Sequence, residues 1–428
     1  MQYKHFQTQI EQGIFTITFN QENSKVNTLC EPVLLELEQI LDEISCKIDI
    51  KAVVFKSAKD DVFIAGADIN EIKDIKTQED ARKKVYRGQS IITKIEKLSS
   101  CKNRGFPVFT FAIINGACMG GGLELALACD FRICIENDKT KLALPEVNLG
   151  IIPGFGGCIR LPKIVGLINA LPIILTGAPI DTKKAKKIGL VDAVFPSFNN
   201  QALIQKFIEG KIAKKQKPVR HVYLIQKYLR HFILSKAKSQ VIQNTKGFYP
   251  APLVAINVLS KTFSLCFSQK RALKIELNQF CNLCITDTNK NLIHLFFSTE
   301  ALKKNDFNID KSVKEKTINE VSVLGAGVMG GGIAWLFSKI NIPVKMKDIN
   351  LKAIGIGYAQ IAKIYKSMLK KRKIKPNELT QKYNLISHTI ENKDIAASDL
   401  VIEAVVEDRF VGMHFFNPVN IMPWVVVI

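Results

Sequence analysis

The sequence predicts an α/β protein with more than one domain. Its 428 residues exceed what a single hydrophobic core usually serves, so two or three domains are expected. In the first half, short stretches with the composition of strands alternate with stretches whose apolar residues recur at helical spacing, which is typical of an α/β layer fold. Two glycine-rich turns, one in each half, stand where a strand gives way to an apolar helix.

The first predicted domain covers residues 1–195. Near residues 31–44, Leu34, Leu37, Leu41 and Ile44 lie on one helical stripe, which predicts an amphipathic helix. Strands are expected at residues 14–20, 52–57, 107–115 and 190–195, further helices from about 77 to 98 and from Gly122, and a glycine-rich loop at 150–157.

Two further regions follow. Residues 196–312 are mainly helical and basic, with no clear strand and no active-site motif, so they are interpreted as packing helices and a connector. A charged stretch then precedes a new strand at 320–325, which places the main boundary near residue 312. Residues 313–428 are expected to form a second α/β domain, a partial doubly wound parallel sheet of the Rossmann type.

The net charge of +21, from 60 Lys and Arg against 39 Asp and Glu, raises the question of a nucleic-acid partner. The lysines are dispersed in short clusters, however, and no aromatic residues are interleaved with them as stacking platforms. A lysine-rich surface that tolerates phosphorylated ligands is therefore favoured over nucleic-acid binding.

A membrane span, a secretion signal and a metal site are all disfavoured. The longest uncharged stretch, 105–123, is interrupted by Pro107, Asn115 and five glycines, and the N-terminus lacks an apolar signal core, so a cytoplasmic location is expected. The ten cysteines sit mostly in apolar settings, as expected of free thiols in a reducing compartment. Cys281 and Cys284 form a lone C-x-x-C without further ligands nearby, so no metal is predicted.

Three stretches of the first domain point to one kind of chemistry. The small residues of FIAGADI (63–69) let a ligand lie against the backbone. In INGACMGGGLELALACD (114–130), Gly120, Gly121 and Gly122 expose N–H groups where a helix begins, and such groups stabilise a developing oxyanion. The third stretch, LPEVNLGIIPGFGG (144–157), follows an apolar strand with a turn and a glycine loop.

These stretches contain two carboxylates, Glu124 near the helix start and Glu146 in the turn. Both have apolar neighbours in the sequence, and burial raises a carboxyl pKa toward neutrality, which suits acid–base work. Taken singly, each has a simpler interpretation. A Glu near a helix start is often only a partner of the helix dipole, and a Glu after proline is often a solvated turn residue.

These stretches closely resemble the crotonase, or enoyl-CoA hydratase/isomerase, superfamily. The resemblance also includes LTG (175–177) and AKKIGLVDAV (185–194), keeps the family's order and spacing, and covers roughly residues 5–195. It implies a spiral of ββα turns, trimeric in stand-alone members, and a substrate that is a coenzyme A thioester. The implied oxyanion donors are the N–H groups of Ala67 and Gly121, and Ala65 matches a substrate-binding position.

The same resemblance implies hydration as the reaction. Glu124 matches the group that activates the attacking water, and Glu146 matches the group that exchanges the proton at the α-carbon. Water would add to a trans-2-enoyl-CoA and give a 3-hydroxyacyl-CoA. Relatives that catalyse other reactions often lack one carboxylate, so the presence of both favours hydration, with double-bond isomerisation as a side activity.

The second glycine turn is GAGVMG (325–330), which fits G-x-G-x-x-G. It follows the strand VSVL and opens an apolar helix, as a turn that binds a diphosphate requires. Asp348 ends the next strand-like run, eighteen residues past Gly330. An acid there accepts hydrogen bonds from ribose hydroxyls and disfavours a 2′-phosphate, which predicts NAD rather than NADP.

The second domain resembles the 3-hydroxyacyl-CoA dehydrogenase family in residues 321–350, 398–408 and 412–423. With a hydratase ahead of it and FFSTEALKK (296–304) matching the connector, the whole arrangement resembles the alpha-subunit family of bacterial fatty-acid oxidation complexes. His414 matches the base that takes the hydroxyl proton, and Glu300 a position near the acyl-CoA. The matches to NAD-contacting positions are Gly325, Gly327, Met329, Gly330, Asp348, Val405, Val406, Glu407 and Asn417.

The dehydrogenase half departs from its family's pattern. Between Asp408 and Val411 the family has a further helix and strand, and the carboxylate expected twelve residues after His414 is replaced by Val426. A histidine without that partner loses basicity and its fixed tautomer. The chain also ends before the family's helical domain, so a vestigial dehydrogenase is expected.

Three hypotheses follow for the whole chain. The first is an active hydratase with a vestigial dehydrogenase, the second a fully bifunctional enzyme, and the third a non-catalytic acyl-CoA-binding scaffold. The expected partners are a thiolase beta subunit and further copies of the chain in a homo-oligomer.

Overall fold

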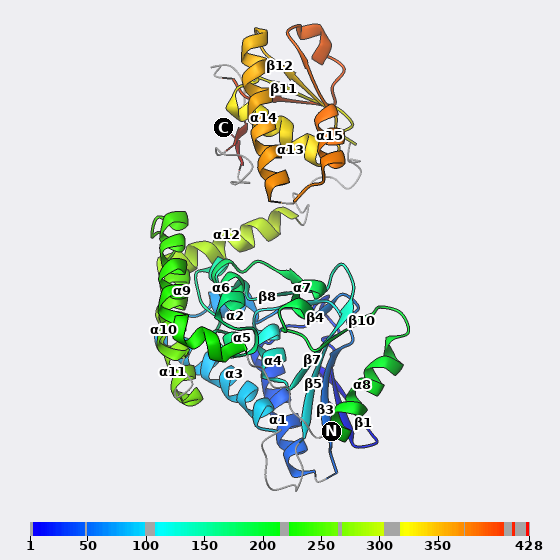
Figure 1. Cartoon of the computed structure of the whole chain (residues 1–428), viewed down its shortest axis with the longest axis vertical. Coiled ribbons are helices and arrows are strands. Elements are labelled where there is room, and N and C mark those ends of the chain that lie inside the picture. Colours follow the sequence, from blue (N-terminus) through cyan, green and yellow to red (C-terminus); the bar gives the residue numbers. More distant parts are fainter. Residues whose placement is uncertain are drawn as a thin grey trace. The chain divides into compact units, whose positions relative to one another are not determined.

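The computed structural model describes residues 3–47, 49–98, 108–214, 222–263, 268–303, 317–371, 373–405, 413–415 and 425–427, without side chains for 222–227 and the last two segments. The chain divides into two compact units, Met1–Asp306 and Phe307–Ile428 (Figure 1). The boundary predicted near residue 312 lies outside the described residues.

The main sheet of the first unit has the order β1-β2-β3-β5-β7-β10. Its strands are β1 (Phe6–Glu11), β2 (Ile14–Phe19), β3 (Ala52–Ser57), β5 (Phe109–Ile114), β7 (Phe131–Glu136) and β10 (Ala193–Pro196). β1 is antiparallel to β2, and the other neighbours are parallel. The prediction missed β1, an edge strand in which only Phe6 is buried, and it began the last strand three residues too early.

A second sheet of short strands carries the loops that form the site. Its order is β4-β6-β8-β9, made from Val62–Ile64, Ala117–Met119, Lys141–Ala143 and Ile180–Asp181. The chain alternates between the sheets, because β3, β5 and β7 belong to the main sheet and β4, β6 and β8, which follow them, to the small one. A helical segment follows each pair, which confirms the predicted α/β class and its ββα turns. Strands of two or three residues are too short to show a two-residue alternation, so the sequence did not reveal them.

Helices cover both faces of the main sheet. On β3, Val53 and Phe55 pack into the same core cluster as helices α1 and α3, while Ala52 and Val54 face the cluster that contains Ile208 of α8. The helical segments up to β10 are α1 (Glu31–Cys46), α2 (Ile69–Lys73), α3 (Gln78–Leu98), α4 (Gly121–Ala128), the 3-10 helix η2 (Pro145–Leu149), α5 (Gly157–Val165), α6 (Leu167–Thr176) and α7 (Thr182–Lys187). The stripe predicted for α1 is buried as expected.

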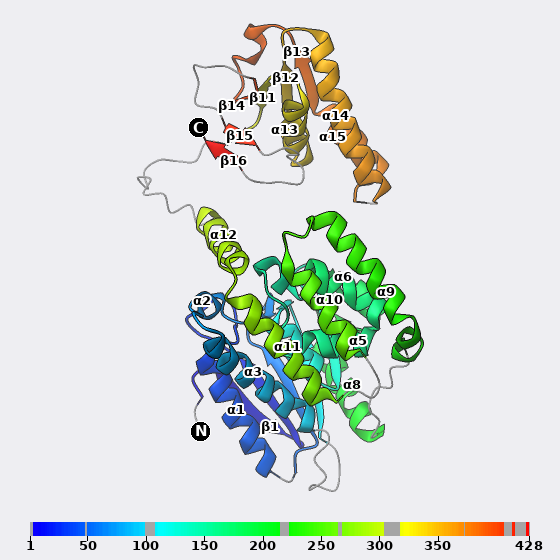
Figure 2. The ribbon, with the colours of Figure 1, turned by 90° about the vertical axis from the view of Figure 1, so that its left-hand side faces the viewer.

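In the following region, the described elements after β10 are all helices. It contains α8 (Asn200–Lys214), α9 (Val222–Thr245), α10 (Pro250–Thr262), α11 (Gln269–Cys284) and α12 (Asp287–Lys303). Figure 2 shows α9, α10 and α11 side by side, and α11 packs against α3. Leu259 of α10 and Phe280 of α11 are buried in the same core as the β3 residues Val53 and Phe55. These helices therefore complete the core on which the site rests.

The second unit contains a parallel sheet of order β13-β12-β11-β14, which is the order 3-2-1-4 of the first four strands of a Rossmann fold. Its own core includes Val323, Trp335 and Met346. A separate antiparallel pair, β15 (Met413–Phe415) and β16 (Val425–Val427), sets His414 opposite Val426. The remaining elements are β11 (Val321–Leu324), α13 (Val328–Lys339), β12 (Val344–Lys347), α14 (Leu351–Lys370), α15 (Pro376–Asn384), β13 (Ile386–Thr389), the 3-10 helix η3 (Asn392–Ile395) and β14 (Leu400–Glu403).

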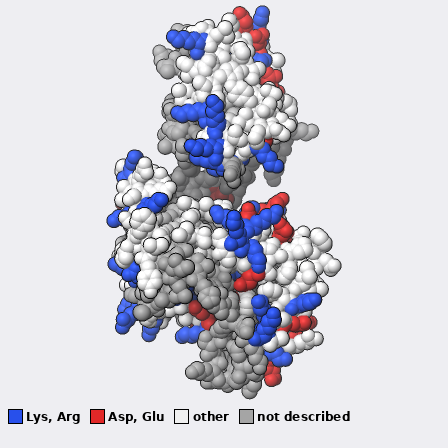
Figure 3. Space-filling view, in the orientation of Figure 1, with Lys and Arg blue, Asp and Glu red and all other residues white. Residues whose placement is uncertain are grey.

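Basic side chains are spread over the face shown in Figure 3 rather than gathered into one stripe. In the part of the chain that the structure describes, no helix is both long enough and apolar enough to cross a membrane.

Candidate active site

A cavity of about 110 Å³ lies in the first unit. Glu124 of α4 and Glu146 of η2 both line it. So do Ala65 and Ala67, which follow β4, and Gly121 at the start of α4. The fold thus brings together all five residues that the sequence singled out in this domain. Most of the other residues that line the cavity are apolar, so the local dielectric is low. Each hydrogen bond or nearby charge therefore has a strong effect on whether a carboxyl is ionised.

Glycine is required where α4 meets the small sheet. A Cβ on Gly122 would lie 2.5 Å from the carbonyl oxygen of Ile64, so any larger residue would push α4 away from β4. Gly120 has a φ of +49°, and a Cβ there would lie 3.1 Å from Oε1 of Glu146. The glycine run therefore allows the helix start to approach both the strand and the second carboxyl.

The expected oxyanion donors come from two adjacent backbone segments. Gly121 is the first residue of α4, where a helix leaves its N–H groups without intrahelical acceptors. Ala67 forms an isolated parallel bridge with Leu29, and the carbonyl of the preceding Gly66 accepts a hydrogen bond from Leu29 N at 2.8 Å. Gly120 N donates to Ala143 O at 2.9 Å. These bonds hold the segments of Ala67 and Gly121 in place.

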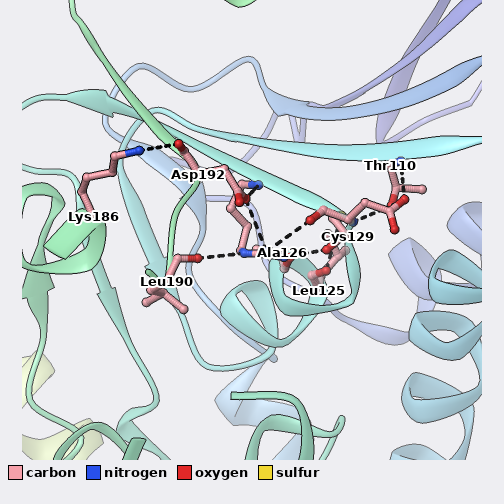
Figure 4. A network of polar contacts seen from close by, with 9 residues as sticks. Thr110, Leu125, Ala126, Cys129, Lys186, Leu190 and Asp192 are labelled. Atoms are coloured by element: carbon pink, nitrogen blue, oxygen red, sulfur yellow. Dashed lines mark hydrogen bonds and ion pairs between the residues drawn. The ribbon is translucent and has the colours of Figure 1, made fainter. Parts of the chain in front are cut away.

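The far end of α4 is held by a buried arginine. Arg132 donates from its guanidinium to the carbonyls of Ala126, at 3.2 Å, and Cys129, at 2.5 Å. Its Nε donates to Leu190 O at 2.8 Å, and Asp192 accepts from its backbone N–H (Figure 4). A cation at the C-terminus of a helix complements the helix dipole. Both ends of the helix that carries Glu124 are therefore anchored.

Glu124 is buried and is held by two backbone donors. Its side chain is 2% exposed, and its Oε1 accepts hydrogen bonds from the N–H groups of Phe155 and Gly157, each at 2.7 Å. Burial raises the pKa of Glu124 to about 7, and the two N–H groups and the Arg160 guanidinium oppose that rise. This carboxyl can therefore gain and lose a proton near neutral pH, as a general base must.

Glu146 has the opposite environment. Its Oε2 is buried and has no hydrogen-bond partner. Burial raises the pKa of Glu146 well above its ordinary value, and the negative charges of Glu124 and then Glu276 raise it further. Of the two carboxyls in the cavity, Glu146 is therefore the one whose surroundings hold its proton more strongly.

A third buried carboxyl was not found by the sequence analysis. Glu276 of α11 is 0% exposed, although residues 196–312 were expected to hold no active-site motif. Burial and the charge of Glu124 raise its pKa. The signal was present, because Glu276 stands beside Leu273, Leu277 and Phe280 on the buried stripe of α11, where a charged residue is unusual.

The glycine turn of the second unit has the geometry of a diphosphate site. Gly325 has a φ of +93°, and a Cβ on Gly330 would lie 1.7 Å from the carbonyl oxygen of Gly325. Nothing lies within 4 Å of a Cβ on Gly327, directly before α13, so a ligand can approach the helix N-terminus there. Asp348 Oδ2 accepts from Ala326 N at 2.6 Å, which holds the acid against the turn. These residues fit NAD.

The structure says less about the other residues that were predicted for the dehydrogenase. Met329 lies in the first turn of α13, and Val405 is 45% exposed after β14. Val406, Glu407 and Asn417 lie outside the described residues, and only the strand backbone is described for His414. Glu300 lies near the end of α12 and does not line the cavity of the first unit.

Within the described ranges, no group of three or more His, Cys, Asp or Glu side chains could hold a metal ion. Cys281 and Cys284 are both buried as free thiols on α11.

Comparison with known families finds a match in each unit of the chain. Residues 9–252 match the enoyl-CoA hydratase/isomerase family model. The chain belongs to the enoyl-CoA hydratase/isomerase family. After this hydratase/isomerase region, residues 320–409 match the NAD binding domain of 3-hydroxyacyl-CoA dehydrogenase.

Longer relatives contain both regions of this hydratase/isomerase family member. The chain is 35% identical to the fatty acid oxidation complex subunit alpha of Shewanella loihica, over 98% of this chain and 64% of that protein. It is 34% identical to the subunit of the same name from Aliivibrio fischeri, over 98% of this chain and 66% of that protein. The chain thus spans about two thirds of the length of these relatives. A solved enoyl-CoA hydratase from Bacillus anthracis is 25% identical, with a TM-score of 0.45 over 72% of this chain and 100% of that one.

Proposed function

We propose that the first unit hydrates trans-2-enoyl-CoA thioesters to 3-hydroxyacyl-CoA thioesters in fatty-acid β-oxidation. The observation that carries the proposal is the unequal pair in one cavity. Glu124 accepts two backbone hydrogen bonds, whereas Glu146 has a buried oxygen without a partner. Hydration needs one group that removes a proton from water and another that supplies a proton to carbon, and these environments divide the two tasks.

The reaction follows from this division. Glu124 takes a proton from a water molecule as the water oxygen bonds to the β-carbon of the enoyl group. Electron density moves through the double bond to the thioester oxygen, where the N–H groups of Ala67 and Gly121 stabilise the negative charge. Glu146 then gives its proton to the α-carbon, and the carbonyl re-forms. The product has gained one water molecule, and proton exchange with solvent restores both carboxyls.

The backbone donors contribute to rate rather than only to affinity. The charge on the thioester oxygen is largest in the enolate-like transition state, so donors aimed at it stabilise that state more than the substrate. The apolar lining around Glu146 strengthens each of these interactions, because it keeps the local dielectric low.

For the second unit we propose NAD binding without oxidation of 3-hydroxyacyl-CoA. Gly325, Gly330 and the start of α13 would hold the diphosphate, and Asp348 the ribose. Bound NAD would supply a hydride acceptor for a secondary alcohol. The residue that should orient His414 is Val426, however, which can neither fix the tautomer of the histidine nor stabilise its protonated form. We extend the proposal to a cytoplasmic homo-oligomer that binds a thiolase subunit, as the names of the relatives place them in a complex.

One assay separates the hypotheses. Purified protein is given crotonyl-CoA, and loss of the enoyl absorbance is followed first, then formation of NADH after NAD is added. Loss of absorbance without NADH supports the proposal. Both signals would establish a bifunctional enzyme, and neither signal a non-catalytic scaffold.

The acid is tested by Glu146→Gln, which removes the transferable proton with little change of shape. Turnover of crotonyl-CoA should fall about 10³-fold, within the range for loss of a general acid. Glu43→Gln, at an α1 carboxyl paired with Lys47, is the matched control and should keep wild-type turnover. Wild-type turnover in Glu146→Gln would refute the assignment.

A further inference from the structure

The cavity of the first unit has a charged mouth and a buried apolar end. Asp68, Glu71 and Lys84 line its mouth and are partly exposed, and Lys84 and Glu71 form an ion pair at 3.7 Å. Its buried end is lined by Val85, Gly154, Phe155 and Phe280. The charged coenzyme A part of a thioester is costly to bury, so it belongs at the mouth. The acyl chain therefore points to the buried end.

The ring of Phe155 fills the space between two helices at the buried end. A Cβ on Gly88 of α3 would lie 2.2 Å from its Cε1, and a Cβ on Gly121 of α4 would lie 3.2 Å from its Cδ2. Glycine at residue 88 thus leaves the room that the ring occupies. Because Gly121 N is the expected donor to the thioester oxygen, an acyl chain bound there extends toward this ring.

The ring is carried by loop 154–158, whose backbone is held by hydrogen bonds on both sides of the cavity wall. Phe155 N donates to Glu124 Oε1 at 2.7 Å. Further along the loop, Cys158 N donates to Oε2 of Glu276 at 2.9 Å. A shift of the loop would break hydrogen bonds that hold the catalytic base. A longer acyl chain must therefore displace the ring itself.

Gln89 of α3 lies behind the ring. It is 5% exposed, and its Nε2 donates to Gly154 O at 2.9 Å and to Leu273 O at 3.1 Å. Gln89 and Leu273 line a groove between α3 and α11 but do not line the cavity. Phe155 on the cavity side and Gln89 on the groove side thus separate the two spaces.

The cavity is small for a long acyl chain. Its volume of about 110 Å³ is less than the ~150 Å³ of a dry apolar cavity that holds one benzene molecule. The same space must take the thioester carbonyl, the enoyl carbons and the attacking water. Little room therefore remains beyond the β-carbon.

We propose that Phe155 determines the specificity for acyl chain length, and that its ring, seated on Gly88, restricts the first unit to short-chain enoyl-CoA thioesters. The inference rests on the proposed hydration and names the substrate class of that site. A short chain ends before the ring, whereas a longer chain must displace it, so the cost falls on long substrates alone. A residue with only a structural role would lower the rate equally for every chain length.

The experiment compares kcat/KM for crotonyl-CoA and for trans-2-decenoyl-CoA, a longer substrate with the same reactive group. The wild-type protein should prefer crotonyl-CoA by about tenfold or more. Phe155→Ala removes the ring but keeps the N–H that binds Glu124. Its ratio of kcat/KM for decenoyl-CoA to that for crotonyl-CoA should rise about tenfold over the wild-type ratio, as expected when one or two further methylene groups are buried.

A smaller change at the same residue has a matched control. Phe155→Leu should raise the ratio about fourfold, the gain expected for one further methylene group. Phe109→Leu is the control, because Phe109 is 2% exposed in the cluster on the other face of the main sheet and does not line the cavity. It loses packing of the same kind, and its ratio should stay at the wild-type value.

A substitution at the seat of the ring should act in the opposite direction. Gly88→Ala places a Cβ where the ring lies and pushes the ring toward the cavity. The ratio of kcat/KM for trans-2-hexenoyl-CoA to that for crotonyl-CoA should then fall about fivefold. An unchanged ratio in this variant would show that Gly88 does not set the position of the ring.

Two results would overturn the inference. One is a wild-type protein that hydrates decenoyl-CoA as well as crotonyl-CoA, and the other is an unchanged ratio in Phe155→Ala. If Phe155→Ala does not fold, as judged by circular dichroism, the ratio in Phe155→Leu decides. Failure of the proposed function is distinct, because the wild-type protein would then hydrate neither substrate.

Discussion

The two glycine turns of this chain have the same local structure, a strand followed by a glycine turn and a helix, but different surroundings. Gly120–Gly122 and Gly325–Gly330 each follow a strand and open a helix whose first N–H groups are available to a ligand. Around the first turn, the fold adds Glu124 and Glu146, both in the cavity and in contrasting environments. Around the second, the described residues add Asp348, which holds the turn through Ala326 N.

The difference shows that a helix N-terminus supplies a binding site for negative charge but not a reaction. In the first unit the proposed reaction depends on two carboxyls that burial and nearby charges have made unequal. In the second unit the histidine that should supply the chemistry faces Val426 in strand register. We therefore interpret the first turn as the centre of the proposed catalytic site, and the second as the proposed cofactor-binding turn.

Among changes at the two turns, the largest expected effect comes from removing the donor at the first turn. Gly121→Pro deletes the N–H of the first helical residue, a position where proline is tolerated in a helix. Loss of one oxyanion donor should lower kcat for crotonyl-CoA about 10²- to 10³-fold. Gly121→Ala is the control. Its Cβ would lie 3.2 Å from the Phe155 ring and 3.3 Å from Leu29, both movable side chains, so its loss should stay within about tenfold. Equal losses in the two variants would show that crowding, not the donor, is responsible.

At Glu124, a substitution is expected to increase the stability of the folded protein. The folded protein releases this proton near pH 7, whereas an unfolded chain releases it near the ordinary value of 4.5. The contribution of Glu124 to the free energy of unfolding is therefore present at low pH and is lost as the pH rises from about 4.5 to 7. Glu124→Gln avoids the loss and should stabilise the first unit by about 3 kcal/mol at pH 8, with a much smaller gain at pH 5.

Urea unfolding can assign that gain to the correct unit. Both tryptophans, Trp335 and Trp424, lie in the second unit, so tryptophan fluorescence follows that unit and circular dichroism follows both. The stabilised transition should appear in circular dichroism and be absent from fluorescence. An equal gain at both pH values would mean that the charge of Glu124 is not its source.

The smallest effect is expected at the second turn. Asp348→Asn removes the negative charge that favours ribose hydroxyls, and NAD should bind about tenfold more weakly, as measured by calorimetry. Glu378→Gln, in the first turn of α15, is the control and should bind NAD as the wild type does. If the wild-type chain binds no NAD at all, the second turn is only a structural element, and the contrast between the halves becomes sharper.

Local patterns in the sequence accounted for much of the fold. The buried stripe of α1, the boundaries of β3 and the strand–glycine–helix order at both turns were predicted, because each depends on neighbouring residues and a fixed period. The polar edge strand β1 and the short strands of the small sheet were not predicted. β1 pairs with its neighbour β2 in a hairpin, but only its first residue is buried, so it shows no alternation of buried and exposed positions. The short strands of the small sheet pair with partners that are distant in the chain.

For the candidate site, too, some features follow from the sequence and others only from the tertiary structure. The sequence by itself determined which residues could carry the chemistry, since Glu124, Glu146 and the glycines stand in recognisable stretches. Only the tertiary structure decided that Glu124 accepts backbone hydrogen bonds while an oxygen of Glu146 is buried without one, and only it brought Glu276 against loop 154–158. The physical reason is that the charge of a carboxyl depends on burial, nearby charges and hydrogen-bond donors, and these come from segments that lie far apart in the chain, such as loop 154–158 and α11.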